Sequence, residues 1–442
     1  MTNNATPTAQ SGNPLATQDQ YEIEATAIKL LKRDDVQNAK EQARLSLRTD
    51  PKANTQAGLA TLEQALEEGA QALLYDVILR DTSRPRIGIT ANAAHSWFGH
   101  HVHGARYGID NPDTIYRYAV LDPKGHYRLT GQPAAGKLPS QYTFLMYENF
   151  RAGAVVPGLP QDPPSNAPPP ENDAYTVGLF DQDIEKAADG SFVLTLSQNT
   201  NQEQRNHIQF NEFCTTLFMR QAIPNWQNQT ALKLTLERLD AHETPAKSDD
   251  QLAEAFVARI QPHIHFWAQA ANLYLYRTAA NTLPVPVSRG GAWGYATLGN
   301  FELKEDEALI VTIDSKGADY TGFILVDPWA ISREHISQSA SLNNTQSHVN
   351  GDGSMTYVIA ATDPEIQNWL DTDGLNSGGI MIRWQAFNKH PERGEGLIQK
   401  VELVKLSALD SVLPANIPRI TPNQRKEQLK NREAAYHRRL AN

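Results

Sequence analysis

The strongest constraint on the fold of this chain is that its strand-like segments occur in two runs, separated by one long helical segment. In the first run, short stretches rich in β-branched and aromatic residues are expected as strands, among them 115–120, 192–197 and 208–221. The same pattern returns between 308 and 406. Because strands do not alternate with helices, a doubly wound parallel sheet is not expected. The sequence predicts an all-β fold with helical additions (α+β), built from two antiparallel β-sandwich or jelly-roll-like units.

Helical periodicity predicts the other elements. Apolar residues recur at three- and four-residue spacing from Tyr21 onward and again over about 55–80. A long helix is expected over about 249–281, followed by a loop rich in Pro and Gly over 284–299. A final amphipathic helix is expected over about 422–440, because Thr421 is a good N-cap and a proline follows it in the first turn.

A chain of 442 residues is too long for one ordinary hydrophobic core, so several domains are expected. The predicted parts are a disordered tail (1–20), a helical N-terminal region (21–82), a first β-rich domain (83–245), a helical linker with a loop (246–300) and a C-terminal β-sandwich with a terminal helix (301–442).

Composition and charge restrict the partners. The formal net charge is −10, and the basic residues near the C-terminus alternate with glutamates, which is typical of a solvated helix face; nucleic acid is therefore not expected as a partner. The single cysteine, Cys214, cannot form an intrachain disulfide or a Cys-based zinc site. No segment has the length and apolar character of a membrane span, and residues 1–20 lack a signal-peptide pattern, so we expect a cytoplasmic protein without a membrane partner.

Cofactor-binding motifs do not occur in the sequence. The glycine-rich stretches 288–294 and 374–379 lack the strand, helix and Lys-Ser/Thr context of a dinucleotide or phosphate loop. We therefore predict no cofactor.

Two segments carry the acid, amide and aromatic groups that are typical of acid/base sites. In the first, Asp113 and Tyr116 belong to a turn that leads into a strand. In the second, Asp371 lies on a loop beside apolar residues that would raise its pKa, and Arg383 is expected to pair with it or to anchor an anionic group. The alternative interpretation is that these residues only form turns and hold the loops in place. The residues expected to bind a substrate are Asn111, Asn343, Asn368, Trp293, Trp369 and Trp384.

A histidine cluster between Gly99 and Gly104 is a candidate metal site. On a strand, His101 and His103 would project from one face, close enough to share a metal ion, and His100 directly precedes them. A third ligand would have to come from a nearby residue such as Asp110 or His95. The alternative interpretation is a polar loop between two glycines.

Ordered motifs in this chain resemble a known bacterial family. The N-terminal set is Asn111-Pro112-Asp113-Thr114-Ile115-Tyr116 and Tyr127-Arg128-Leu129-Thr130-Gly131. The C-terminal set is Ser341-Leu342-Asn343-Asn344-Thr345-Gln346, Asp352-Gly353-Ser354, Asp363-Pro364, Asn368-Trp369-Leu370-Asp371-Thr372, Gly374, Gly378 and Arg383-Trp384. Together they resemble the family catalogued as domain of unknown function 1214, often joined to the related companion domain 1254. The resemblance covers roughly residues 100–410 and implies two all-β units, but it implies no established activity.

Three functions are compatible with these observations. The first is a cofactor-independent acid/base enzyme of the lyase, isomerase or hydrolase type, acting on a small, mostly apolar molecule such as a terpenoid, a steroid or an aromatic compound. In it, Asp113 or Asp371 would act as acid or base, Tyr116 and Asn368 would orient the substrate, Arg383 would hold a polar group, and the tryptophans would form apolar walls. The second is a carbohydrate-binding or carbohydrate-processing jelly-roll protein, and the third is a metal-dependent enzyme using the cluster from His100 to His103. Homo-oligomerisation stays open.

Overall fold

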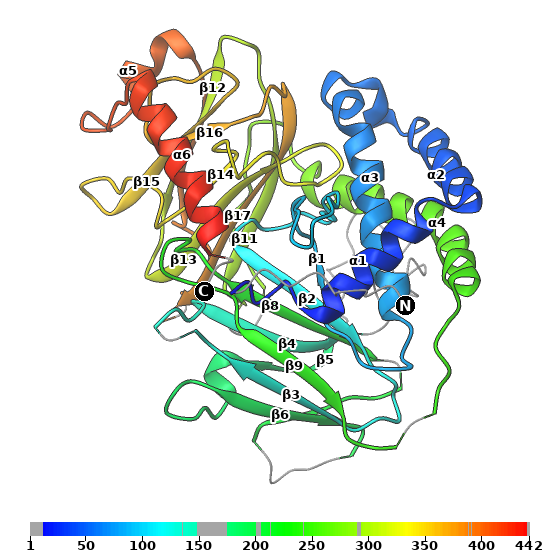
Figure 1. Ribbon diagram of the computed structural model, residues 1–442. Coiled ribbons are helices and arrows are strands. Elements are labelled where there is room, and N and C mark those ends of the chain that lie inside the picture. Colours follow the sequence, from blue (N-terminus) through cyan, green and yellow to red (C-terminus); the bar gives the residue numbers. More distant parts are fainter. Residues whose placement is uncertain are drawn as a thin grey trace.

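The computed structural model describes residues 12–134, 136–147, 175–199, 205–212, 214–241, 243–289, 293–387, 389 and 391–439. Residues 1–11 of the predicted tail, the Pro-rich segment 157–173 and part of the glycine-rich stretch 288–294 lie outside the described residues. The described part contains mainly β-structure with helical additions, arranged as two sandwich-like units and a helical layer (Figure 1). This architecture confirms the predicted fold class.

The first sandwich consists of a five-stranded and a four-stranded sheet. In spatial order, the five-stranded sheet contains β1 (Gly88–Thr90), β2 (Thr114–Val120), β8 (Thr216–Ala222), β4 (Gln141–Tyr147) and β5 (Tyr175–Phe180). The four-stranded sheet contains β7 (His207–Gln209), β6 (Phe192–Ser197), β3 (Tyr127–Gln132) and β9 (Lys233–Arg238).

The second sandwich is built in the same way. Its five-stranded sheet contains β10 (Val287–Ser288), β11 (Tyr295–Glu302), β17 (Ser377–Phe387), β13 (Ala318–Val326) and β14 (Ser341–Asn343). Its four-stranded sheet contains β16 (Trp369–Asp371), β15 (Ser354–Ala360), β12 (Glu307–Asp314) and β18 (Ile398–Lys405).

The two sandwiches repeat one topology. Each strand of the first unit, in chain order, corresponds to the strand nine positions later in the second unit, so that β2-β8-β4 at the centre of one sheet corresponds to β11-β17-β13 in the other. Even the exception to antiparallel pairing recurs, because β6 pairs parallel with β7 and β15 pairs parallel with β16. The molecule is therefore a structural repeat, which the sequence patterns did not indicate.

Alternating side chains explain how each sandwich forms. Along β8, Leu217 and Met219 enter the core between the two sheets, whereas Phe218 between them faces the helical layer. In the second sandwich, Val311 of β12 and Ile382 of β17 meet in the equivalent core. Burial of this apolar surface is the main force that holds each pair of sheets together.

Two segments differ from their expected structure. Residues 208–221, expected as one strand, form β7 and β8 in different sheets, because the chain turns at Asn211, whose carbonyl accepts a hydrogen bond from the Cys214 amide (3.1 Å). The expected loop over 284–299 contains β10 and the first half of β11. Long-range pairing with β17 makes β11 a strand, and no local signal reports such pairing.

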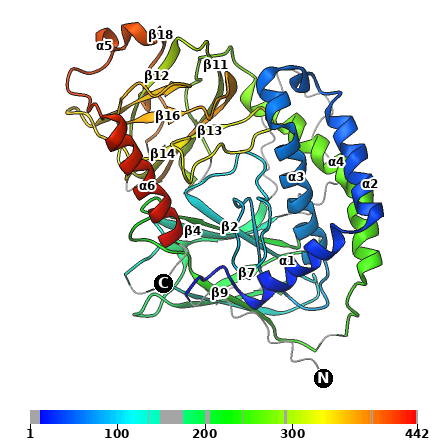
Figure 2. The same ribbon diagram turned by 45° about the horizontal axis from the view of Figure 1, so that its top comes forward.

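A layer of four helices lies on the outer face of the five-stranded sheet of the first sandwich, and the second of these helices packs on the third and fourth and not on the sheet (Figures 1 and 2). They are α1 (Gln18–Leu30), α2 (Asp34–Leu47), α3 (Gln56–Leu79) and α4 (Asp249–Leu275). Short helical segments are 3-10 turns at Pro51–Asn54, Asp181–Asp183 and Leu406–Ala408, and α5 (Leu409–Val412). Within the described ranges, no helix is both long enough and apolar enough to cross a membrane.

The C-terminal helix α6 (Pro422–Arg438) runs along both sandwiches (Figure 1). Near its start, Arg425 bonds Asp363 and the Ile366 carbonyl of the second sandwich. Just beyond its end, the Arg439 guanidinium donates to the Pro112 carbonyl of the first unit (2.5 Å). The ring of Tyr436 lies edge-on to Trp226, with centroids 5.3 Å apart. The helix therefore fastens the two sandwiches to each other.

Candidate functional site

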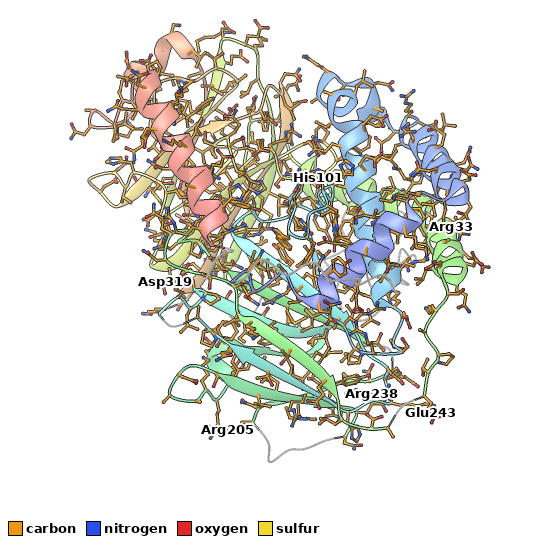
Figure 3. All side chains as sticks on the ribbon, in the orientation of Figure 1. Arg33, His101, Arg205, Arg238, Glu243 and Asp319 are labelled. Atoms are coloured by element: carbon orange, nitrogen blue, oxygen red, sulfur yellow. The ribbon has the colours of Figure 1, made fainter. Side chains whose placement is uncertain are left out.

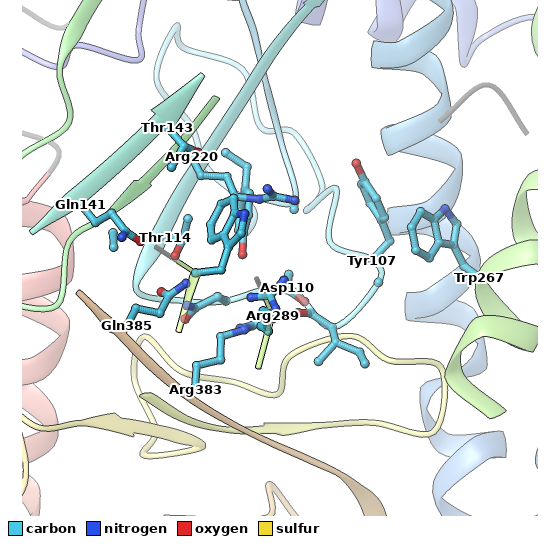
Figure 4. Close-up of a pocket in the computed structure, with 17 residues that line it drawn as sticks. Tyr107, Asp110, Thr114, Gln141, Thr143, Arg220, Trp267, Arg289, Arg383 and Gln385 are labelled. Carbon is cyan, nitrogen blue, oxygen red and sulfur yellow. Dashed lines mark hydrogen bonds between the residues drawn. The ribbon is translucent and has the colours of Figure 1, made fainter. Parts of the chain in front are cut away.

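A small pocket of about 120 Å³ lies where the two sandwiches and helix α4 meet (Figure 4). One wall is the face of β2, β8 and β4 that points away from the first sandwich core. The opposite wall comes from β17 and from the loop between β10 and β11 of the second sandwich. Tyr107 and Trp267 lie together at one end, with ring centroids 4.8 Å apart.

Strand register explains the first wall. Tyr116, Arg220 and Thr143 are direct partners across β2, β8 and β4, so their side chains share one face. The next row of the same face, two residues along each strand, contains Thr114, Ala222 and Gln141. Every one of these residues lines the pocket.

Strand geometry also explains part of the second wall. Arg383 and Gln385 are two residues apart on β17 and therefore point to the same side of their sheet. Arg289 and Trp293 lie between β10 and β11 and also line the pocket. In Figure 4, Arg220 enters the pocket from one side, and Arg289 and Arg383 enter from the other.

Aromatic rings hold two of these arginines in place. The Arg220 guanidinium lies 4.5 Å from the Phe218 centroid and 4.6 Å from the Trp293 centroid, and it donates to the Tyr147 hydroxyl (2.8 Å). Arg289 lies over the same Trp293 ring at 5.5 Å. Trp293 is thus covered by two guanidinium groups and orients them.

Arg383 retains an unused donor. Its Nη2 donates to the Ile109 carbonyl (2.9 Å), but its buried Nη1 has no hydrogen-bond partner among the described residues. The hydroxyl of Thr143, buried in the opposite wall, also lacks a partner among the described residues. Buried polar groups in native proteins are nearly always hydrogen-bonded, so two unsatisfied groups at one pocket indicate a missing partner there.

Counter-charges for the three arginines are also absent from the part of the chain that the structure describes. Among the residues that the structure describes, none of the three forms an ion pair with a carboxylate. Removal from water, together with the positive charges of Arg383 and Arg220, lowers the pKa of Arg289 to about 10. A strongly cationic pocket has formed inside a protein whose net charge is −10.

Asp110 contributes the carboxyl group in the described lining of the pocket. Its oxygens accept hydrogen bonds from the Ser332 amide (2.8 Å) and the Ser332 hydroxyl (2.6 Å). Burial raises the pKa of Asp110 to about 6, although the nearby Arg106 cation acts in the opposite direction. Arg106 itself is paired with Glu68 (2.5 Å).

Four residues selected from the sequence line this pocket: Asn111, Tyr116, Trp293 and Arg383. Tyr116 stacks on Phe218, with ring centroids 5.9 Å apart. Asn111 stands at the boundary of the pocket, because its amide donates to the buried Tyr320 hydroxyl (2.9 Å).

Asp113 and Asn343 lie behind the pocket in a buried polar network. Asp113 accepts hydrogen bonds from the Trp226 indole (2.9 Å), the Asn343 amide (2.6 Å) and the Tyr320 hydroxyl (3.0 Å). Burial raises the pKa of Asp113 even though three donors stabilise its charge. The network joins the first sandwich to the second, and Asp113 is not part of the pocket lining.

The remaining candidates lie elsewhere in the second sandwich. Trp369 and Asp371 form β16 at the edge of the four-stranded sheet, and Asn368 immediately before it bonds the His348 and Thr356 backbone. Trp384 is fully buried in the sandwich core. The two signature loops, 111–116 and 368–371, therefore do not share this pocket. Burial raises the pKa of Asp371 to about 6 at its separate position.

The histidine cluster has a different arrangement. His100 and His95 each bond one oxygen of the buried Glu24 carboxylate at 2.8 Å. His101 and His103 are exposed, with ring centroids 5.7 Å apart, in the loop beside α3 where Figure 3 labels His101. Over the described ranges, no three His, Cys, Asp or Glu side chains gather as a metal site would require.

Arg220, Arg289 and Asp110 have roles in the pocket that the sequence interpretation did not assign. A signal was available for Arg220, because it directly follows the apolar run 217–219 in the central strand Thr216–Ala222. An arginine there must leave the sandwich core and face a polar site. For Arg289, in a glycine-rich loop, no such signal exists.

Comparisons with known proteins support the fold alone. No family model and no curated protein matches the chain. Among solved structures, it is similar to an uncharacterized protein from Burkholderia cenocepacia, with a TM-score of 0.66 and 24% identity over 88% of this chain and 100% of that one. A protein from Vibrio parahaemolyticus aligns with a TM-score of 0.39 and 10% identity, over 78% of this chain and 98% of the other.

Proposed function

We propose that this protein binds a small organic anion in the pocket between its two sandwiches. The observation that carries the proposal is the convergence of Arg220, Arg289 and Arg383 on one pocket without a carboxylate partner among the described residues. Guanidinium groups match the planar geometry of carboxylates and the oxygens of phosphates, with which they form strong bidentate hydrogen bonds.

Energetics favour this interpretation over a structural role for the arginines. Buried charges without partners are costly, and arginines that serve only stability are normally paired, as Arg106 is with Glu68 and Arg80 with Asp76. A bound anion would supply the missing counter-charge. It would also accept a hydrogen bond from the unused Arg383 Nη1.

Isothermal titration calorimetry with small carboxylates, sulfate and phosphate tests the proposal. Substitution Arg383→Gln should weaken binding about 10- to 100-fold, because it removes a charge-assisted hydrogen bond. Arg205→Gln is the matched control, since Arg205 is an exposed arginine far from the pocket (Figure 3), and it should leave the affinity unchanged. If none of these anions binds the wild-type protein at millimolar concentration, the proposal is wrong.

Acid/base catalysis of the lyase, isomerase or hydrolase type is a second candidate function. Asp110 favours it, because its carboxyl group lines the same pocket and its pKa, raised by burial to about 6, lies close to the range where general acids and bases are effective. Asp110→Asn should then abolish turnover of a bound substrate while binding persists. Retention of wild-type turnover by this variant would exclude Asp110 as the acid or base.

Other expectations from the sequence receive less support. A carbohydrate-binding surface needs exposed aromatic faces, whereas Trp369 and Trp384 are buried and Trp293 is covered by arginines. The expectation of a mostly apolar ligand fits poorly with three cations in the lining. Membership of the family of unknown function, cytoplasmic location and homo-oligomerisation stay predictions.

A further inference from the structure

We infer that the ligand of this pocket is a compact dianion carrying two acid groups, one held by an arginine of each sandwich. This inference rests on the proposed function and adds the charge, the size and the symmetry of the ligand. Each of the three properties follows from a separate observation.

The charge follows from the lining. Arg220, Arg289 and Arg383 bring three positive charges, and ionised Asp110 brings one negative charge. No other lysine, histidine or acidic side chain belongs to the described lining. Among the described lining residues, two positive charges therefore remain uncompensated, and a ligand with two negative charges would neutralise them. A monoanion would leave one buried cation without a counter-charge.

The arrangement of the acid groups follows from the structural repeat. Arg220 lies on β8 and Arg383 on β17, which are the equivalent central strands of the two five-stranded sheets. Each sandwich thus contributes one arginine from the same strand of the repeated topology, and the two enter the pocket from opposite sides (Figure 4). Arg289 also comes from the second sandwich. Its guanidinium lies over the Trp293 ring, which the Arg220 guanidinium also contacts. A ligand with an acid group at each end can engage both sandwiches at once.

The size follows from the cavity volume. A cavity of about 150 Å³ holds a molecule the size of benzene. The pocket measures about 120 Å³, so it accommodates a molecule of at most about six non-hydrogen atoms. The shortest dicarboxylate, oxalate, falls within this limit, as do inorganic sulfate and phosphate. Long-chain diacids and sterol-sized acids exceed it.

Calorimetry on the full-length protein with a ligand series tests the inference. The dicarboxylates oxalate, malonate, succinate and adipate vary length at constant charge, and acetate and propionate provide matched monoanions. Sulfate and phosphate show whether the charge alone is sufficient. All titrations are run at one ionic strength, because screening weakens every anion. We expect oxalate to bind at least about tenfold more tightly than propionate, and succinate and adipate to bind weakly.

Two variants distinguish ligand contact from a structural effect. Arg220→Gln and Arg383→Gln should each reduce the preference for the dicarboxylate over propionate to about twofold or less, because the described lining then carries one uncompensated positive charge instead of two. Arg205→Gln should retain the wild-type preference. The ratio of the two affinities is the readout, since a partly misfolded variant loses both affinities together. The urea midpoint of each variant confirms that it folds.

The outcomes separate this inference from the proposed function. If no anion binds, the proposed function itself fails. If anions bind but propionate equals oxalate, or adipate binds most tightly, the anion site stands and the compact dianion is refuted. Tighter binding of sulfate or phosphate than of every dicarboxylate would also refute two separate acid groups, because one tetrahedral anion would then satisfy the site.

Discussion

Asp113 allows a decisive test of whether a buried carboxylate acts in structure or in chemistry. It is 1% exposed and accepts hydrogen bonds from the Trp226 indole, the Asn343 amide and the Tyr320 hydroxyl. In Asp113→Ala, the Trp226 N–H loses its acceptor in the described structure, which costs about 1–3 kcal/mol. The Asn343 amide keeps its bond to the Pro224 carbonyl, but its second N–H loses its acceptor in the described structure, which costs about 1–3 kcal/mol. The Tyr320 hydroxyl can donate to the Asn111 amide oxygen instead, so it loses about 0.5–1.5 kcal/mol.

With a small cavity added, the expected loss for Asp113→Ala is about 3–5 kcal/mol of unfolding free energy. Asp113→Asn should behave differently, because the side-chain shape is kept and Tyr320 can still donate to Asn111 (3.1 Å). Since burial already raises the pKa of Asp113, the folded protein does not favour its charge, and the neutral amide should change stability by less than about 1 kcal/mol.

Urea unfolding followed by tryptophan fluorescence measures both effects, and calorimetry measures anion binding in Asp113→Asn. A structural Asp113 predicts a large loss for the alanine variant and normal stability and binding for the asparagine variant. If the alanine variant lost less than about 1 kcal/mol, the hydrogen-bond reasoning would be refuted. If Asp113→Asn kept its stability but lost turnover of a known substrate, Asp113 would have a chemical role.

Three further predictions concern buried charges. Burial raises the pKa of Asp371 to about 6, so the stability of the wild-type protein should fall as pH rises from about 4 to above 6. In urea unfolding, Asp371→Asn should be about 2 kcal/mol more stable than the wild type at pH 7.5 and equally stable near pH 4. Equal stability of variant and wild type at both pH values would contradict this prediction. Arg117 is 2% exposed and donates to the Leu232 carbonyl, and its Nε has no partner among the described residues. Arg117→Met should therefore raise the free energy of unfolding by about 1–3 kcal/mol and shift the urea midpoint upward. A lower midpoint would refute the reasoning. Protonation of Asp110 removes a negative charge from the pocket, while Arg106 and Glu68 beside it stay paired with each other. Sulfate should therefore bind about 3- to 10-fold more tightly at pH 5 than at pH 7.5. Calorimetry on Asp110→Asn should show no such pH dependence.

Local patterns in the sequence identified most of the regular elements. The expected helix over 55–80 is α3 (Gln56–Leu79), and the expected strand over 115–120 is β2 (Thr114–Val120). These elements carry their own signals, namely apolar periodicity and β-branched composition. Short strands such as β1 and β14, three residues each, carry no such signal and depend on pairing with distant strands.

The candidate site was only partly predictable because its parts meet through the packing of two sandwiches. Tyr116 and Arg383 were selected from the sequence, and the structure brings both to one pocket. Asp371 was selected for the same kind of reason, an acid beside apolar residues, yet β16 lies in the other sheet of its sandwich. Which loop faces which domain is fixed by long-range contacts, and a single sequence does not contain that information.

The division of the arginines between two sandwiches has a consequence for how the molecule unfolds. With the pocket empty, Arg220 of one unit and Arg383 and Arg289 of the other repel one another across the junction. A bound anion replaces this repulsion by attraction and raises the stability of the folded state according to its affinity and concentration. The bound ligand therefore stabilises the contact between the two sandwiches. In calorimetric melting, saturation with ligand should merge any separate transitions of the two sandwiches into one cooperative transition.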